Sequence, residues 1–176
     1  MELAQIETSP SRLKDNIVAD IHTVINELGY KIVDENTDKP WGAYFRFAPE
    51  NTSDFIGKFF ENSKFPDWSQ NQELSPKFLL VAPEKRLSWQ YHARRGELWR
   101  VIRGPIIVYL SDNDTLPKNP VQLQTGNHIE IGKSIRHRLA GNHTWGIVAE
   151  IWVHTEKDNP SSEEDIVRLE DDFGRT

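Results

Sequence analysis

The hydrophobic and polar positions of the first fifty residues predict helix, then strand. Residues 11–29 carry apolar side chains at helical spacing, and the segment closes on a glycine typical of a helix end: Leu13, Ile17, Val18, Ile21, Val24, Ile25, Leu28 and Gly29. Residues 31–47 read as a short strand, a turn and a second strand. Residues 52–62 predict a short helix, although Gly57 weakens it.

From residue 77 onward the pattern changes to short β-rich runs. Pro, Gly, Asn and Asp separate these runs about every ten residues, as in an antiparallel barrel or sandwich. The runs are residues 77–84, 87–93, 97–104, 105–112, 121–132, 135–141 and 144–154. The acidic tail begins with Ser161-x-x-Glu164, a spacing typical of a helix start, so we expect a helical turn there.

Composition narrows the class of protein. A chain of 176 residues is long enough for one packed domain, and the net charge of −6 disfavours nucleic-acid binding, which needs a basic surface. The absence of cysteine excludes disulfides and thiolate metal sites. No apolar run approaches the roughly 20 residues that span a bilayer, and the N-terminus has no apolar signal core. We therefore expect a cytoplasmic protein that binds neither membrane nor nucleic acid.

One stretch concentrates candidate metal ligands. Gln90 and His92 stand two residues apart, so in a strand they project from the same face. Glu97 follows a segment that can turn the chain, and His137 lies forty residues later in a strand that could face them. Two imidazoles, a carboxylate and an amide oxygen suit a divalent first-row metal, but these ligand types do not name the ion. The alternative for each histidine alone is an ordinary hydrogen-bonded or surface residue.

The same stretch carries a family resemblance. Residues 88–104 resemble the first metal motif of the cupin superfamily, with Gln90 in the place of its first histidine. Residues 126–142, which contain His137, loosely resemble the second cupin motif. The resemblance implies a mainly β fold, the cupin double-stranded β-helix or jelly-roll barrel.

Three segments in one order narrow the resemblance. Residues 39–42 (KPWG), 87–99 and 164–175 are similar to the cupin domain of type II phosphomannose isomerases (mannose-6-phosphate isomerases). That domain often follows a GDP-mannose pyrophosphorylase domain, whose glycine-rich nucleotide loop we do not find here. We therefore expect a stand-alone form, with a helical N-terminal extension at residues 1–38 and a cupin barrel domain with the C-terminal motif at residues 39–176.

The resemblance also implies a cofactor and its ligands. The metal would be divalent, commonly zinc, and would be held by Gln90, His92, Glu97 and His137. The family usually has further histidines at three positions that differ here, which leaves the sugar open: Ala93, Arg94 and Leu98.

Aldose–ketose isomerisation needs a base, a group that stabilises the developing oxyanion and an anchor for the phosphate. A divalent metal supplies the second, and Arg or Lys supplies the third. By resemblance, the substrate-binding candidates are Lys39, Arg95 and Arg175. The catalytic candidates are Arg168, Glu170 and Asp171, with Arg168 also favoured for the phosphate and His143 as a further candidate base.

The predicted function is therefore a metal-dependent sugar-phosphate isomerase, with mannose-6-phosphate to fructose-6-phosphate as the nominal reaction. One alternative keeps the chemistry and changes the sugar, for example to a heptose phosphate. Another is a noncatalytic, metal-containing cupin that binds a sugar or sugar phosphate. An iron-dependent oxygenase is a third, against which the glutamine and the C-terminal motif count. By analogy with other cupins we expect a homodimer.

Overall fold

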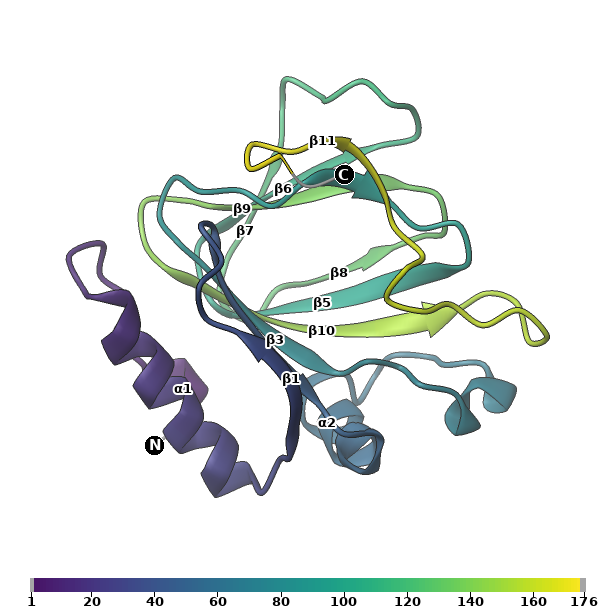
Figure 1. The fold of residues 1–176 in the computed structure, drawn as a ribbon, viewed down its shortest axis with the longest axis horizontal. Coiled ribbons are helices and arrows are strands. Elements are labelled where there is room, and N and C mark those ends of the chain that lie inside the picture. Colours follow the sequence, from purple (N-terminus) through teal and green to yellow (C-terminus); the bar gives the residue numbers. More distant parts are fainter. Residues whose placement is uncertain (1, 175–176) are drawn as a thin grey trace.

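The computed structural model describes residues 2–174 and is built from two antiparallel sheets with helices on one side (Figure 1). In the described part of the chain, no helix is both long and apolar enough to cross a membrane. Two α-helices, α1 (Lys14–Leu28) and α2 (Thr52–Phe59), precede most of the strands. Short 3-10 turns cover Leu3–Gln5, Pro49–Asn51 and Asp67–Asn71.

The two sheets face each other. The larger has the strand order β1 (Ile32–Asn36), β2 (Gly42–Phe47), β3 (Lys77–Val81), β10 (Gly146–His154), β5 (Arg95–Arg103) and β8 (His128–Ile131). The smaller has the order β11 (Val167–Glu170), β4 (Trp89–Tyr91), β9 (Arg136–Gly141), β6 (Ile106–Ser111) and β7 (Val121–Leu123). The segment after β10 leaves the larger sheet and crosses to the smaller one, where it becomes β11 (Figure 1).

Side-chain alternation along the larger sheet creates two separate cores. On its outer face, Phe45, Phe78 and Ile151 pack with Ile21 of α1 and Phe55 of α2. On its inner face, a second cluster fills part of the space between the sheets: Leu79, Val81, Trp99, Val101, Ile106, Val108, Ile131, Leu139 and Val148. Because the outer core already buries a large apolar area, the inner face can carry polar residues as well.

The structure agrees with most predicted elements. The helix in residues 11–29, the helix after residue 52 and the predicted strands are all present, with residues 121–132 divided into β7 and β8. At Ser161-x-x-Glu164 the tail makes a single hydrogen-bonded turn, in which the backbone N–H of Asp165 donates to the carbonyl oxygen of Ser162 at 3.0 Å, and no helix follows among the described residues. Residues Val167–Glu170 instead pair with β4, where main-chain hydrogen bonds extend the smaller sheet, and Ser161 donates its hydroxyl to Asp165.

Gly42 begins β2, and only glycine fits at this position. Its φ is +147°, a conformation that L side chains rarely adopt, and an added Cβ would lie 1.8 Å from the carbonyl oxygen of Leu80. The absence of a side chain therefore lets β2 pair directly with β3.

We expect Gly42→Ala to lower the free energy of unfolding by about 2–4 kcal/mol, because β2 would have to separate from β3 and adopt a strained φ. Urea denaturation measures this loss. Gly57→Ala is the matched control, since nothing lies within 4 Å of its added Cβ. In the interior of α2 this change should stabilise by about 0.5–1 kcal/mol. Equal unfolding midpoints for the two variants would contradict the analysis.

Candidate metal centre and its cavity

Three buried side chains converge between the sheets and form a group that could hold a metal ion. His92 follows β4, Glu97 lies on β5 and His137 lies on β9, so both sheets contribute. Each residue is 2 % exposed, and their potential ligand atoms all lie within 4.8 Å of one another. The sequence separates these residues by up to 45 positions, and the fold brings them together.

Hydrogen bonds orient both imidazoles toward the centre of the group. Nδ1 of His92 donates to the carbonyl oxygen of Asp165, and Nδ1 of His137 donates to that of Ile135 at 2.9 Å. These bonds leave each Nε2 facing Glu97, at 3.0 Å for His92 and 3.4 Å for His137. A metal-binding histidine needs this arrangement, with one nitrogen donating outward and the other holding a lone pair.

Nε2 of His137 is buried and has no hydrogen-bond partner among the described residues. Burial also lowers the pKa of His92, although Glu97 opposes this shift. The lowered pKa favours the neutral imidazole, which is the form that binds metals. Burial would raise the pKa of Glu97, but the neighbouring His92 and His137 outweigh it and hold that pKa well below its usual range. Two imidazoles and one carboxylate therefore fit a divalent cation.

Gln90 lies beside this group as the sequence predicts. It is the register partner of His137, and its Nε2 lies 3.5 Å from Nε2 of His92. Its Oε1 accepts a hydrogen bond from the Ser88 hydroxyl at 2.5 Å. A half-turn of the carboxamide would exchange the two atoms, and Ser88 could then accept a bond from Nε2, so Gln90 could supply an oxygen ligand.

Arg95 contacts two of the three candidate metal ligands His92, Glu97 and His137, which we call the metal-ligand group. Its guanidinium stacks on the Trp152 ring at 3.9 Å and donates to Oε1 of Glu97 at 3.3 Å. It also donates to the Ser161 hydroxyl and to the carbonyl oxygens of Ser162 and Asp165. Arg95 is only 4 % exposed, and its guanidinium makes these contacts within the protein. The family resemblance, by contrast, makes Arg95 a candidate for substrate binding.

Asp165 ties the C-terminal segment to the turn that carries His92. Its carboxylate accepts hydrogen bonds from the backbone N–H groups of Ala93 and Arg94 at 2.9 and 3.0 Å, and from the Ser161 hydroxyl at 2.6 Å. Burial raises the pKa of Asp165, but these hydrogen bonds outweigh it and the net pKa is lowered. One residue thus fixes both the turn and, through its carbonyl oxygen, the ring of His92.

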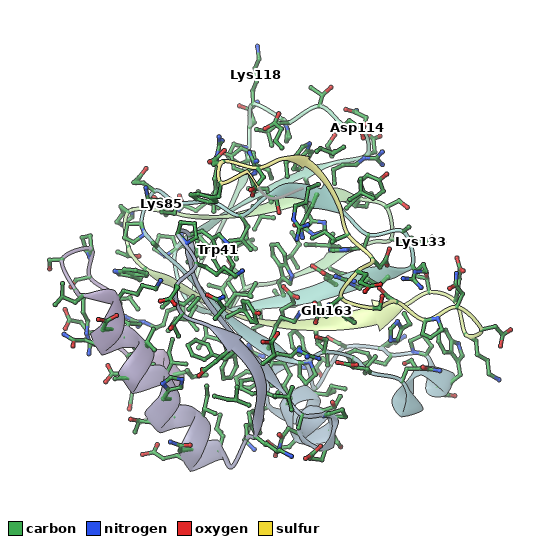
Figure 2. All side chains as sticks on the ribbon, viewed as in Figure 1. Trp41, Lys85, Asp114, Lys118, Lys133 and Glu163 are labelled. Carbon is green, nitrogen blue, oxygen red and sulfur yellow. The ribbon has the colours of Figure 1, made fainter. Side chains whose placement is uncertain are left out.

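A cavity of about 300 Å³ opens onto the group, between the sheets. Figure 2 shows the side chains that fill this region, including Trp41 and Glu163, which line the cavity. Trp41 is 3 % exposed, and its indole N–H has no hydrogen-bond partner among the described residues. Buried donors without partners are rare in proteins, so this N–H and the Nε2 of His137 favour a polar ligand in the cavity.

Of the other candidate catalytic and substrate-binding residues in the described part of the chain, some line the cavity and others do not. Lys39 and Arg168 line the cavity, whereas Glu170 and Asp171 are not among the described residues that do. The Glu170 side chain is 53 % exposed and contacts Arg138, and Asp171 accepts a hydrogen bond from the backbone of Phe173. His143 is exposed. Arg175 lies outside the described residues.

Two charged residues that the sequence analysis missed lie in the cavity wall. Glu150 of β10 is 6 % exposed and Lys77 of β3 is 8 % exposed, and they lie 3.5 Å apart. The sequence feature that could have identified Glu150 is its position in the middle of the apolar run GIVAEIWV. A charge at the centre of a buried strand is costly unless it has a partner or a function.

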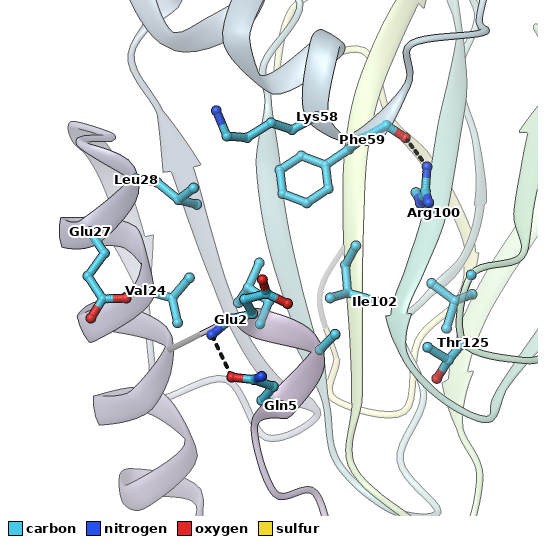
Figure 3. Close-up of a pocket in the computed structure, with 14 residues that line it drawn as sticks. Glu2, Gln5, Val24, Glu27, Leu28, Lys58, Phe59, Arg100, Ile102 and Thr125 are labelled. Atoms are coloured by element: carbon cyan, nitrogen blue, oxygen red, sulfur yellow. Dashed lines mark hydrogen bonds between the residues drawn. The ribbon is translucent and has the colours of Figure 1, made fainter.

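A second and larger cavity, of about 770 Å³, lies outside the barrel, near α1, α2 and β5 (Figure 3). Val24, Leu28, Phe59 and Ile102 line it, and Arg100 closes one side by donating to the carbonyl oxygen of Phe59. The metal-ligand group does not reach this cavity, because His92, Glu97 and His137 are absent from the described residues that line it.

Comparison with solved structures identifies the fold. CapF, a capsular polysaccharide assembling protein from Staphylococcus aureus, superposes with a TM-score of 0.52 at 14 % identity, covering 80 % of this chain and 32 % of CapF. A recombinant oxalate oxidase in complex with glycolate gives a TM-score of 0.50 at 17 % identity, covering 76 % and 58 %. The chain thus spans about a third of CapF, and these likenesses describe the fold alone. With its two facing antiparallel sheets, the protein has the cupin fold that the sequence predicts.

The sequence identifies the family. Residues 61–171, more than half of the chain, match the family described as mannose-6-phosphate isomerase C-terminal, and the chain belongs to that family. No curated protein matches the chain in sequence. The family range includes His92, Glu97 and His137 as well as Glu150 and Asp165.

We expect Asp165→Asn to weaken metal binding about 10- to 100-fold, because an amide cannot accept all three hydrogen bonds that hold the His92 turn. Calorimetric titration with Zn²⁺ measures the affinity.

For Asp165→Asn we also expect a loss of about 2 kcal/mol of unfolding free energy at pH 7. Because the folded pKa of Asp165 is lowered, its contribution exists above the unfolded pKa of about 3.9 and disappears as the pH falls through the folded pKa.

Asp158→Asn is the control, since that residue is exposed. The stability difference between Asp165→Asn and the wild type should therefore shrink below pH 4, while Asp158→Asn should match the wild type throughout. A difference that stays constant with pH would contradict the assignment of the lowered pKa to Asp165.

Proposed function

We propose that this protein is a metal-dependent aldose–ketose isomerase of a sugar phosphate, with mannose-6-phosphate to fructose-6-phosphate as the reaction to test first. The observation that carries the proposal is the buried group of His92, Glu97 and His137 beside a cavity that cationic side chains also line. Membership of the mannose-6-phosphate isomerase C-terminal family supports the reaction class.

We assign the metal to Gln90, His92, Glu97 and His137, and propose zinc as the ion because nitrogen and oxygen ligands suit it. When bound, the metal would polarise the sugar carbonyl and stabilise negative charge that develops on oxygen. The protein itself orients the ligands through the carbonyl oxygens of Asp165 and Ile135. Arg95 holds the Glu97 carboxylate, and we propose that it positions this ligand rather than binding phosphate.

Lys39 and Arg168 supply positive charge for the phosphate in this proposal. Both line the cavity, and Arg168 is the register partner of Gln90, so its side chain shares a face with a metal ligand. A guanidinium matches two phosphate oxygens at once. The cavity volume of about 300 Å³ is at the small end for ligand sites, which favours a monosaccharide phosphate over a nucleotide sugar. The homodimer and the cytoplasmic location stay predictions.

The first prediction from the proposed function concerns catalytic activity. Zinc-loaded protein should convert mannose-6-phosphate to fructose-6-phosphate in a coupled assay, and the His92→Ala, Glu97→Ala double variant should lose both the bound metal and turnover. Chelation followed by addition of Zn²⁺ should abolish and restore the wild-type rate. Turnover that survives complete removal of metal would contradict the proposal. Stoichiometric metal without turnover of mannose-6-phosphate would exclude that sugar, and a heptose phosphate would be the next substrate to test.

The second prediction concerns the phosphate anchor. Arg168→Ala should raise KM about 10- to 100-fold with a smaller change in kcat, because it removes charge-assisted hydrogen bonds to a part of the substrate that does not react. Arg12→Ala is the matched control, since Arg12 pairs with Asp20 of α1 at 2.6 Å, away from the cavity. An unchanged KM in Arg168→Ala would remove this residue from the substrate site.

A further inference from the structure

Glu150 occupies the centre of β10, where an apolar side chain would pack without cost. The flanking residues Val148, Ala149 and Ile151 are fully buried. The partner of Glu150 is the ammonium of Lys77 at 3.5 Å, which Glu163 also contacts at 3.2 Å. Burying a carboxyl beside a shared cation contributes little to stability compared with apolar packing, so stability alone does not explain this glutamate.

Strand register directs Glu150 toward the metal-ligand group. Glu150 pairs with Trp99 of β5 and Glu97 pairs with Trp152 of β10, so the two glutamates are diagonal neighbours on the same face. Diagonal neighbours in an antiparallel pair lie about 7–8 Å apart. Both line the same cavity, so a small ligand held at one carboxyl also lies within reach of the other.

The surroundings keep Glu150 available for proton transfer. Burial, followed by the negative charge of Glu97, raises its pKa to about 7, although Lys77 and Arg95 oppose the shift. A carboxyl with a pKa near neutrality can both accept and return a proton at physiological pH.

The other carboxylates that line the cavity in the described part of the chain are less suitable. Glu97 faces the two imidazoles. The side chain of Asp34 is 46 % exposed and accepts a hydrogen bond from Tyr44. The side chain of Glu163 is 49 % exposed and accepts hydrogen bonds from Ser75 and Lys77.

We propose that Glu150 is the catalytic acid–base group of the isomerisation, an inference that rests on the proposed function and replaces Glu170 and Asp171 in that role. The Glu150 carboxylate takes the proton from C2 of the open-chain aldose as the C2–H bond breaks. The released electron pair forms the C1=C2 bond, and the C1=O1 π pair moves onto O1. The product of this step is an enediolate and a protonated Glu150.

The second half of the reaction returns the proton. The O2–H bond gives up its proton to O1, the C2=O2 bond forms, and the C1=C2 electron pair takes the proton of Glu150 at C1. Atoms and electrons balance without an oxidant or reductant, and Glu150 ends as the carboxylate. Lys77 acts as a positioning residue, because its ammonium contacts Glu150 and stacks on the Trp152 ring at 4.9 Å.

The test compares zinc-loaded wild type, Glu150→Gln, Glu150→Asp, Glu170→Gln and Glu130→Gln, the last being an exposed control on β8. For each we would measure zinc content, melting temperature, kcat, KM and the loss of deuterium from [2-²H]mannose-6-phosphate to solvent. Binding of mannitol-1-phosphate, which has no carbonyl group, reports whether the cavity is intact.

We expect Glu150→Gln to lose about 10²- to 10⁴-fold in kcat and to lose deuterium release in proportion. Zinc content, KM and analogue binding should stay within a few fold of the wild type. Glu150→Asp should recover part of kcat, and Glu170→Gln and Glu130→Gln should keep it.

Four outcomes would overturn the inference. A kcat within fivefold of the wild type in Glu150→Gln would exclude this residue as the base, as would a loss of kcat and deuterium release in Glu170→Gln instead. Loss of zinc or of analogue binding in Glu150→Gln would assign it a structural role. Wild-type protein that binds zinc but turns over no aldose phosphate would overturn the proposed function itself, and the role of Glu150 with it.

Discussion

The anchoring of Asp165 is the interaction on which the site depends. Its carboxylate accepts three hydrogen bonds, two of them from the backbone N–H groups of the turn between β4 and β5, while its carbonyl oxygen holds the ring of His92. This contact joins the C-terminal segment to the turn, next to the pairing of β11 with β4. The segment therefore completes the metal-ligand group, although it contributes no ligand itself.

Separation of two cores allows the inner face to be polar. The outer face of the larger sheet packs against α1 and α2 and forms an apolar core of its own. Stability derived from that core can offset the cost of burying Lys77, Arg95, Glu97 and Glu150 between the sheets. The cations and carboxylates there contact one another, so most of the buried charge is compensated locally.

Trp152 shows how one aromatic residue organises this charge. Arg95 stacks on its ring at 3.9 Å and Lys77 lies over it at 4.9 Å, and these two cations in turn contact Glu97 and Glu150. The ring attracts both cations through its electron-rich face. Trp152 thus holds the cation beside Glu97 and the cation beside Glu150 against one ring.

Local patterns in the amino-acid sequence predict the helices, the strands and the part of the site that neighbouring residues form. Hydrophobic periodicity predicts α1 and the strands, and two-residue spacing places Gln90 and His92 on one face, because both features depend on neighbours in the chain. Tertiary structure alone decided three things. It engaged the Arg95 guanidinium, it turned residues Val167–Glu170 into a strand, and it brought Glu150 diagonal to Glu97. These contacts join residues 53 to 81 positions apart in the chain, and no local pattern encodes which of them meet.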